Sequence, residues 1–262
     1  MIPLKQRLKR GEVVFGPWCV IPSGVVMNII AASGFDFVII DLEHSPASFE
    51  TAEEMCRAAQ SEGASPIIRL GQINEEHILK SLDIGSEGLI VAHVETASAA
   101  AKVITLSKYQ PVGKRGFSPF TRAGKYSGGD ILEHAHIQNE ITLVGVILEG
   151  KKVLDNIDAI LKTQFLDIIY VGAYDLSQAL GMPGDVNNPV IKKQMEKCVR
   201  KIRDAKIAAG GYVARDTEDM AWMVDIGMQF ITYLPDCAAI SEKMIGAVQN
   251  FNRVLNRKER KL

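Results

Sequence analysis

The segment "FVIIDLEHSP", residues 37–46, begins as a continuous apolar run and ends in Asp41, Glu43 and His44. An apolar run without polar alternation is typical of a strand that is buried on both faces of a parallel sheet. Three titratable side chains within four positions therefore follow a buried strand. A fold that buries such strands and uses their ends for chemistry would explain this arrangement.

Similar apolar runs recur along the chain and alternate with amphipathic segments. The runs are "VVFGPWCVI", "SPIIRL", "EGLIVAHV", "TLVGVILEG", "LDIIYVGAYDL", "GGYVA" and "FITYL". The segment "NPVIKKQMEKCVRKIRDAKIAAG" predicts a long helix with Pro189 in its first turn and Gly210 after its end. About eight strand–helix units predict an α/β fold, a (β/α)8 TIM barrel. An open doubly wound sheet is the alternative, but "PSGVVMN" after the first strand lacks a glycine-rich phosphate-binding turn.

Composition limits the class of protein. The 262 residues, 47% of them apolar, suffice for one large domain covering residues 1–262. The net charge of −1 argues against nucleic-acid and membrane-surface partners. Four cysteines without paired spacing predict reduced thiols. Because we find no export signal and no apolar run near about 18 residues, we expect a cytoplasmic protein.

Charged groups end several of the predicted strands. Besides His44, these are Arg69 in "PIIRL", Glu149 in "VILEG" and Asp175 in "VGAYDLS". Each has a simple structural explanation: a loop histidine, a buried ion-pair partner, a helix N-terminal acid and an N-cap. In a closed barrel, however, all four strand ends meet at one mouth, where active sites lie. Their joint occurrence favours an active site.

The chemistry of these side chains suggests an enolate reaction. Glu149 and Asp175, with no Cys or His beside them, suit a hard cation such as Mg²⁺ or Mn²⁺, a Lewis acid towards an enolate. Arg69 would stabilise the developing negative charge, and His44 would move a proton. Together they indicate that a carbon–carbon bond is made or broken. A Schiff-base route is disfavoured because no strand-like run contains a lysine.

The chain resembles the HpcH/HpaI aldolase family, which are metal-dependent class II pyruvate aldolases. The resemblance covers nearly the whole chain. It rests on "GFDFVIIDLEHSP", "PIIRL", "LDIGSEGLIVAHVETASAA", "KRGFSP", "VILEG", "VLDNIDAI" and "VGAYDLSQALGMPGD". It implies a barrel of the phosphoenolpyruvate/pyruvate-binding type. It also implies a homo-hexamer, a trimer of dimers, in which the C-terminal helix packs on a neighbouring protomer.

The resemblance also implies roles for individual residues. Glu149 and Asp175 would bind the divalent metal, Mg²⁺ or Mn²⁺ with Co²⁺ as a further candidate, and pyruvate or another 2-oxo acid would chelate it. His44 matches the acid/base histidine and Arg69 the enolate-stabilising arginine. Asp83, by pattern alone a surface acid on a helix, matches the acid that raises the basicity of the histidine.

The remaining correspondences concern the substrate. The backbone of Gly172, Ala173 and Tyr174, next to Asp175, matches the segment whose amides bind the substrate carboxylate. Three positions depart from the family pattern. Ile147 stands in place of a substrate-contacting glutamine, "GAYDLS" replaces "GPADLS", and His93 replaces a small or apolar residue. These departures keep the metal and acid/base groups but alter the substrate shell.

We therefore expect a lyase that cleaves or forms a 4-hydroxy-2-oxo acid or a 2-keto-3-deoxy sugar acid, with pyruvate and an aldehyde as partners. One alternative is a related enolate condensation, such as citrate synthesis from oxaloacetate and acetyl-CoA. Another is a non-catalytic barrel that binds a keto acid. The departures at Ile147 and Tyr174 are the reason for considering it. The glycine-rich segment 110–130, with Arg115 and Arg122, is expected to shape the pocket for the second substrate.

Overall fold

The computed structural model describes residues 2–148, 153–211 and 213–255. Its strands form one curled, all-parallel sheet in the order β7-β6-β5-β4-β3-β2-β1-β9-β8. The strands are β1 Val14–Cys19, β2 Phe37–Asp41, β3 Ser65–Leu70, β4 Gly88–Val91, β5 Leu143–Leu148, β6 Ile168–Val171, β7 Ala208–Gly210, β8 Val213–Ala214 and β9 Phe230–Tyr233. The parallel α/β architecture predicted from the apolar runs is confirmed.

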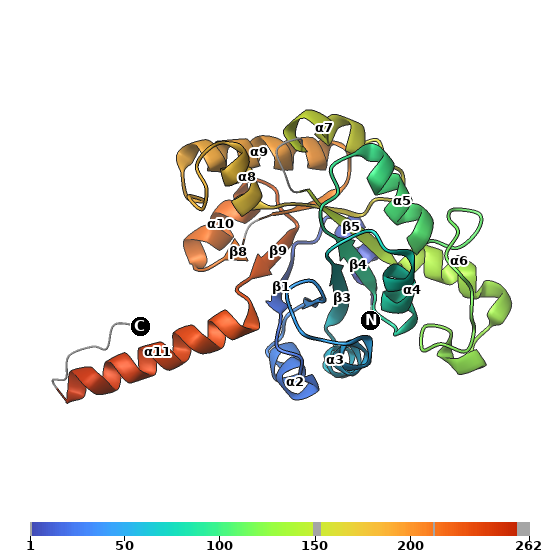
Figure 1. Cartoon of the computed structure of the whole chain (residues 1–262), viewed down its shortest axis with the longest axis horizontal. Coiled ribbons are helices and arrows are strands. Elements are labelled where there is room, and N and C mark those ends of the chain that lie inside the picture. The colour runs from blue at the N-terminus through green and yellow to red at the C-terminus, as the bar shows by residue number, and fades with distance from the viewer. Residues whose placement is uncertain (1, 149–152, 212, 256–262) are drawn as a thin grey trace.

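Most helices follow a strand along the chain and lie around the outside of the sheet, whereas the C-terminal helix extends away from it (Figure 1). They are α1 Leu4–Lys9, α2 Gly24–Ala32, α3 Phe49–Ser61, α4 Glu75–Asp83, α5 Ala97–Ser107, α6 Ile131–Ile141, α7 Val153–Ile160, α8 Ala173–Ala179, α9 Pro189–Asp204, α10 Thr217–Asp225 and α11 Asp236–Val254, with a 3₁₀ turn, η1, at Lys125–Ser127. Polar caps begin several of them. Ser48 accepts a hydrogen bond from the amide of Thr51 at the start of α3, and Asn74 accepts one from His77 at the start of α4.

The two faces of the sheet bury different residues. In β2, Phe37 and Ile39 belong to an inner cluster, whereas Val38 and Ile40 pack in the outer layer with the surrounding helices. Successive side chains of a strand point to opposite faces, so Asp41 follows Phe37 and Ile39 inward. By the same alternation Arg69 follows the inner Ile67 of β3. The amino end of the inner cluster is covered by Leu4 and Leu8 of α1.

The segment after α9 differs from the prediction. The long helix expected through residue 209 ends at Asp204, and Gly210 lies inside β7 instead of after a helix. Lys206 has a left-handed backbone (φ 61°), which no helix continues through, and Ala208–Gly210 pair with β6. A short alanine-rich run has no clear periodicity, so its helical and strand forms are indistinguishable by pattern.

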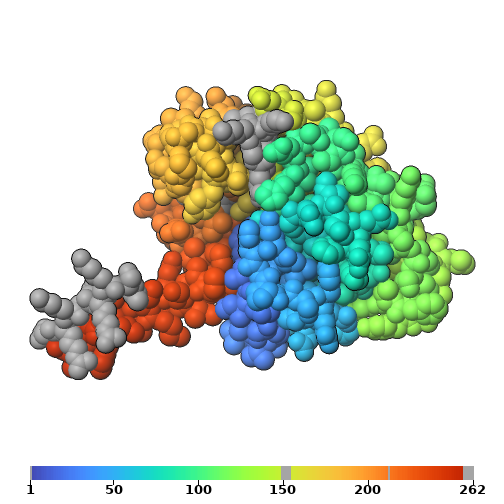
Figure 2. Space-filling view, in the orientation of Figure 1, coloured from blue at the N-terminus to red at the C-terminus, as the bar shows by residue number. Residues whose placement is uncertain are grey.

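The C-terminal helix α11 extends away from the rest of the molecule (Figure 2). Its apolar side chains recur three or four residues apart on one face, and most of them are exposed. They are Ile240, Met244, Val248, Phe251 and Leu255. Among the described residues, no helix has the length and apolar character needed to cross a membrane.

Candidate active site

Asp41 organises the turn after β2. Its side chain is 3% exposed, and its Oδ1 accepts hydrogen bonds from the backbone amides of Glu43 (2.9 Å) and His44 (3.1 Å). An Asx turn of this kind is a local property of aspartate, which can bind amides two and three residues on. Asp41 therefore determines how the next two functional groups leave the strand.

Arg69 lies between two acids of this turn. It is opposite Asp41 in the β2–β3 register, its Nη1 lies 3.0 Å from Asp41 Oδ2, and its Nη2 lies 2.5 Å from Glu43 Oε2. The guanidinium carbon lies 5.2 Å from the centre of the Trp18 ring. The side chain is 11% exposed, and a charge-assisted hydrogen bond to Asp41 together with the ion pair to Glu43 holds it in one orientation.

Glu43 also joins this network to two histidines. Its Oε1 lies 3.0 Å from His93 Nε2, and its Oε2 lies 3.8 Å from His44 Nε2. Gly71 leaves room for it, since a Cβ there would lie 2.8 Å from Glu43 Cγ. His93, two residues after the end of β4, holds a left-handed backbone (φ 57°), a conformation rare for a residue with a side chain. His44 itself is 65% exposed and can turn towards a bound molecule.

A cavity of about 580 Å³ opens at the carboxyl ends of the strands beside this network. Arg69 and Trp18 form part of its wall, and Asp175 contributes a carboxylate. No described side chain forms a hydrogen bond or ion pair with that carboxylate, which suits a group that binds a ligand. The predicted substrate-binding residues Gly172, Ala173 and Tyr174 line the same cavity, and so does Ile147.

The structure thus brings together most of the residues predicted at the mouth. Arg69 and Asp175 share the cavity, and His44 lies beside it through Glu43. Glu149, the predicted second metal ligand, lies outside the described residues. The described part of the chain contains no cluster of three His, Cys, Asp or Glu side chains able to hold a metal.

Asp83 lies away from the mouth cavity, near the amino end of β4. It is the last residue of α4, shortly before β4 begins, whereas His44 follows the carboxyl end of β2. A strand of five residues is roughly 16 Å long at about 3.3 Å per residue, so the two side chains lie at opposite ends of the sheet. The carboxylate of Asp83 pairs with buried Arg115 at 2.7 Å. That Asp83 raises the basicity of His44 remains a prediction.

The segment 110–130 also lies at the amino ends of the strands, between α5 and α6. It contributes no described residue to the mouth cavity of its own chain. The expectation that it shapes the second-substrate pocket therefore does not hold within one chain. The physical reason is that α5 returns the chain to the amino side of the sheet before this segment begins.

Residue patterns drew attention to Asp41 and Glu43 beside His44 but gave them no role, and they did not single out Trp18. Asp41 and Glu43 belong to "DLEH", and the two acids beside His44 were the available signal. Trp18 lacked a polar signal because it lies within an apolar run. Their roles depend on register and alternation, which place them around one guanidinium.

Comparison with known proteins agrees with this geometry. The family model of the HpcH/HpaI aldolase/citrate lyase family matches residues 16–237. The chain belongs to this family. It is 30% identical over 253 residues to a 2-keto-3-deoxy-L-rhamnonate aldolase of Salmonella gallinarum (strain 287/91 / NCTC 13346), covering 96% of this chain and 94% of the relative. The resemblance inferred from the motifs is confirmed, and so is the expectation of an aldolase-family enzyme.

Solved structures show the same fold. The HpcH/HpaI aldolase from Desulfitobacterium hafniense DCB-2 superposes with a TM-score of 0.90 at 27% identity, covering 96% of this chain and 97% of that one. The citrate synthase SbnG superposes with a TM-score of 0.88 at 29% identity, covering 98% of this chain and all of that one. An HpcH/HpaI aldolase and a citrate synthase are therefore both similar in structure to this chain.

Proposed function

We propose that the protein is a divalent-metal-dependent aldolase that cleaves or forms a 2-keto-3-deoxy sugar acid. The observation that carries this proposal is the shared cavity of Arg69 and Asp175, with His44 beside it. The similarity to 2-keto-3-deoxy-L-rhamnonate aldolases supports the substrate class. In the cleavage direction, the products are pyruvate and an aldehyde.

The residues of this chain perform the proton and charge steps. His44 accepts the proton of the substrate's C4 hydroxyl, the C3–C4 bond breaks, and its electron pair passes to the pyruvate fragment as an enolate. Arg69 stabilises the negative charge on the enolate oxygen. Asp41 and Glu43 fix the orientation of its guanidinium. His44 then returns the proton to C3 of the enolate.

The donor chemistry at the mouth fits Mg²⁺ or Mn²⁺, with Co²⁺ as a further candidate. Asp175 offers an oxygen ligand that is not engaged by any described side chain, and Glu149 is the second proposed ligand. A bound divalent cation would supply Lewis-acid polarisation of the 2-oxo group. Backbone amides of Gly172, Ala173 and Tyr174 are proposed to orient the substrate carboxylate.

Asp175→Asn tests the proposal, with Asp158→Asn as a matched control. Both variants lose one negative charge, but Asp158 is 70% exposed and pairs with Lys201 on the outer surface. We expect Asp175→Asn to lose cleavage of 2-keto-3-deoxy-L-rhamnonate and Mn²⁺-dependent deuterium exchange at the methyl group of pyruvate. Asp158→Asn should keep both. Full turnover of Asp175→Asn, or of the unaltered chain in chelator, would refute the metal-dependent mechanism.

Citrate synthesis from oxaloacetate and acetyl-CoA is the second candidate, favoured by the similarity to the citrate synthase SbnG over the whole chain. It would use the same enolate-stabilising Arg69. An assay for citrate with both substrates distinguishes the two activities. Citrate formation without sugar-acid cleavage would replace the first proposal.

We further propose that the sheet closes as a (β/α)8 barrel within a single domain, and that chains assemble as a hexamer. The amide of Gln229, before β9, donates to the carbonyl of Ala209 in β7 (3.0 Å), which supports closure with β7 and β8 as one interrupted strand. The exposed apolar face of α11 supports its packing on a neighbouring protomer. The cytoplasm is the proposed compartment.

A further inference from the structure

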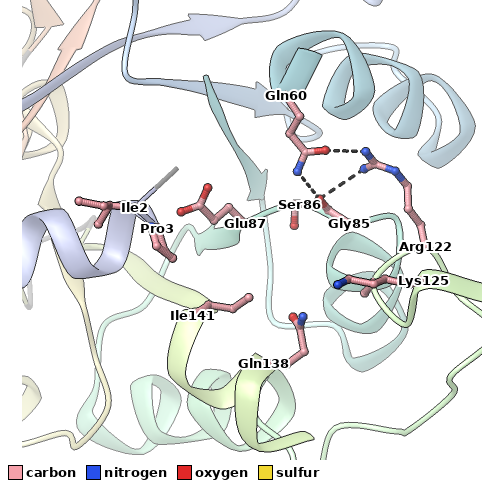
Figure 3. Close-up of a pocket in the computed structure, with 11 residues that line it drawn as sticks. Ile2, Pro3, Gln60, Gly85, Ser86, Glu87, Arg122, Lys125, Gln138 and Ile141 are labelled. Carbon is pink, nitrogen blue, oxygen red and sulfur yellow. Dashed lines mark hydrogen bonds between the residues drawn. The ribbon is translucent and has the colours of Figure 1, made fainter. Parts of the chain in front are cut away.

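A second cavity lies at the amino ends of the strands, on the opposite side of the sheet from the mouth. Its volume is about 330 Å³ (Figure 3). Five segments that are distant in sequence form its wall: the start of α1, the end of α3, the connection from α4 to β4, residues 122–125 and α6. Its size is in the range of pockets that bind small molecules.

Arg122 gives this cavity one positive charge. Its Nη1 donates to the carbonyl oxygens of Ile84 (2.9 Å) and Gly85 (3.4 Å), and its Nη2 donates to Gln60 Oε1 (2.5 Å). None of these acceptors is a carboxylate, so none of them balances the positive charge of the guanidinium. Its remaining N–H donors are available because a guanidinium has five.

Lys125 supplies a second positive charge. In Figure 3 its ammonium and the side-chain amide of Gln138 point into the same space. No described carboxylate lies within ion-pair distance of Lys125. Lys125, Tyr126 and Ser127 all have left-handed backbones (φ 53°, 54° and 65°), a rare run for residues other than glycine. Such strain often occurs at functional sites, and here it presents Lys125 to the cavity.

Glu87 is the acid of this cavity, and it already has a partner. Its Oε1 accepts a hydrogen bond from the backbone amide of Leu4 at the start of α1. The cavity therefore holds two cations, Arg122 and Lys125, against one carboxylate. Ile2, Pro3 and Ile141 give it an apolar side.

We propose that this cavity binds a small organic carboxylate, with the carboxylate on Lys125 and Gln138 and the apolar part against Ile141. Arg122 forms the adjoining wall and adds to the positive potential. The site lies apart from the mouth cavity and shares no residue with it. The inference therefore does not depend on the proposed aldolase activity.

Equilibrium dialysis of the full chain with radiolabelled propionate, at low ionic strength, tests this site. The variants are Lys125→Gln, Gln138→Leu and, as a conservative substitution, Lys125→Arg. Lys193→Gln, on the exposed surface of α9, is the control with the same loss of charge. We expect Lys125→Gln to weaken one class of propionate site about three- to fivefold, the upper part of the range for an exposed ion pair, and Gln138→Leu to weaken the same site. Lys125→Arg and Lys193→Gln should bind as the unaltered chain does.

Comparison with the neutral isostere propionamide tests the requirement for charge. Propionamide should not displace propionate from the Lys125-dependent site. Equal binding of propionate by Lys125→Gln and the unaltered chain would overturn the proposal, and so would equal weakening by Lys193→Gln. Displacement by propionamide at equal concentration would also overturn it. Because propionate can enter the mouth cavity as well, the difference between variants is the decisive measurement.

Discussion

Replacing Asp41 by Asn tests whether one buried carboxylate holds the active-site turn together. In the structure this carboxylate serves three donors: the amides of Glu43 and His44 and the guanidinium of Arg69. Asparagine has one acceptor oxygen and one NH₂ group. It therefore must turn its NH₂ group either towards the two amides or towards the guanidinium. Either choice removes charge-assisted bonds and places donors against donors.

The magnitude follows from burial. The side chains of Asp41 and Arg69 are 3% and 11% exposed, so solvent screens their interaction little. Removing one partner of a buried ion pair costs about 3–5 kcal/mol. Glu43 still contacts Arg69 at 2.5 Å and compensates part of the loss. We therefore expect Asp41→Asn to lower the free energy of unfolding by about 2–4 kcal/mol.

Asp36→Asn is a matched control for this substitution. Asp36 also pairs with an arginine, Arg7 at 2.7 Å, and accepts a backbone amide, that of Phe15 at 2.9 Å. Its side chain is 29% exposed, so the same chemical change should cost about 1 kcal/mol. Urea denaturation measures both. Deuterium exchange at the methyl group of pyruvate should fall in Asp41→Asn only, since only that turn carries His44. If both variants lose equal stability, or if Asp41→Asn retains full exchange, the reasoning is wrong.

Three further predictions concern other parts of the molecule. Burial, and secondarily the charge of Lys5, lower the pKa of Lys108 from 10.5 to about 7, so between these values the unfolded chain binds a proton that the folded chain does not. Unfolding free energy should therefore rise with pH above about 7, and Lys108→Met should flatten this rise in urea titrations at several pH values. Substituting Asp at both Met244 and Phe251 on the exposed face of α11 should reduce the mass of the assembly measured by light scattering, and an unchanged mass would exclude this face from the interface. If Asp83 acts on His44 it must do so between chains, so co-assembled Asp83→Ala and His44→Ala chains should recover activity that neither has alone; no recovery would remove Asp83 from the site.

Much of the fold followed from local pattern. The buried apolar runs of β2 and β3 and the capped amphipathic segments of α3 and α4 were recognisable because burial on both faces and helical periodicity leave strong signals. The position of Arg69 near the end of β3 followed from the same runs, whereas Asp175 lies in the first turn of α8, after β6 has ended. The boundary between α9 and β7 did not, because the alanine-rich stretch near Gly210 fits either state and pairing with β6 decides it.

The sequence predicted only some of the residues at the mouth. His44 and Arg69 stood out as charged groups after apolar strands. The contacts of Glu43 with Arg69 and His93 depend on β2 and β4 lying on either side of β3, which no local pattern specifies. Asp83 shows the opposite case: a motif assigned it to the site, and the direction of α4 carried it to the other end of the sheet.

The sequence by itself determined that the chain forms parallel strands separated by helices, that charged groups follow several strands, and that its motifs belong to an aldolase family. Only the tertiary structure decided which of those groups meet. Hydrophobic periodicity is a property of neighbouring residues and survives in the linear order. Asp41 and Glu43 meet at the guanidinium of Arg69 because of strand order, register and helix direction. These arise only when distant segments pack together.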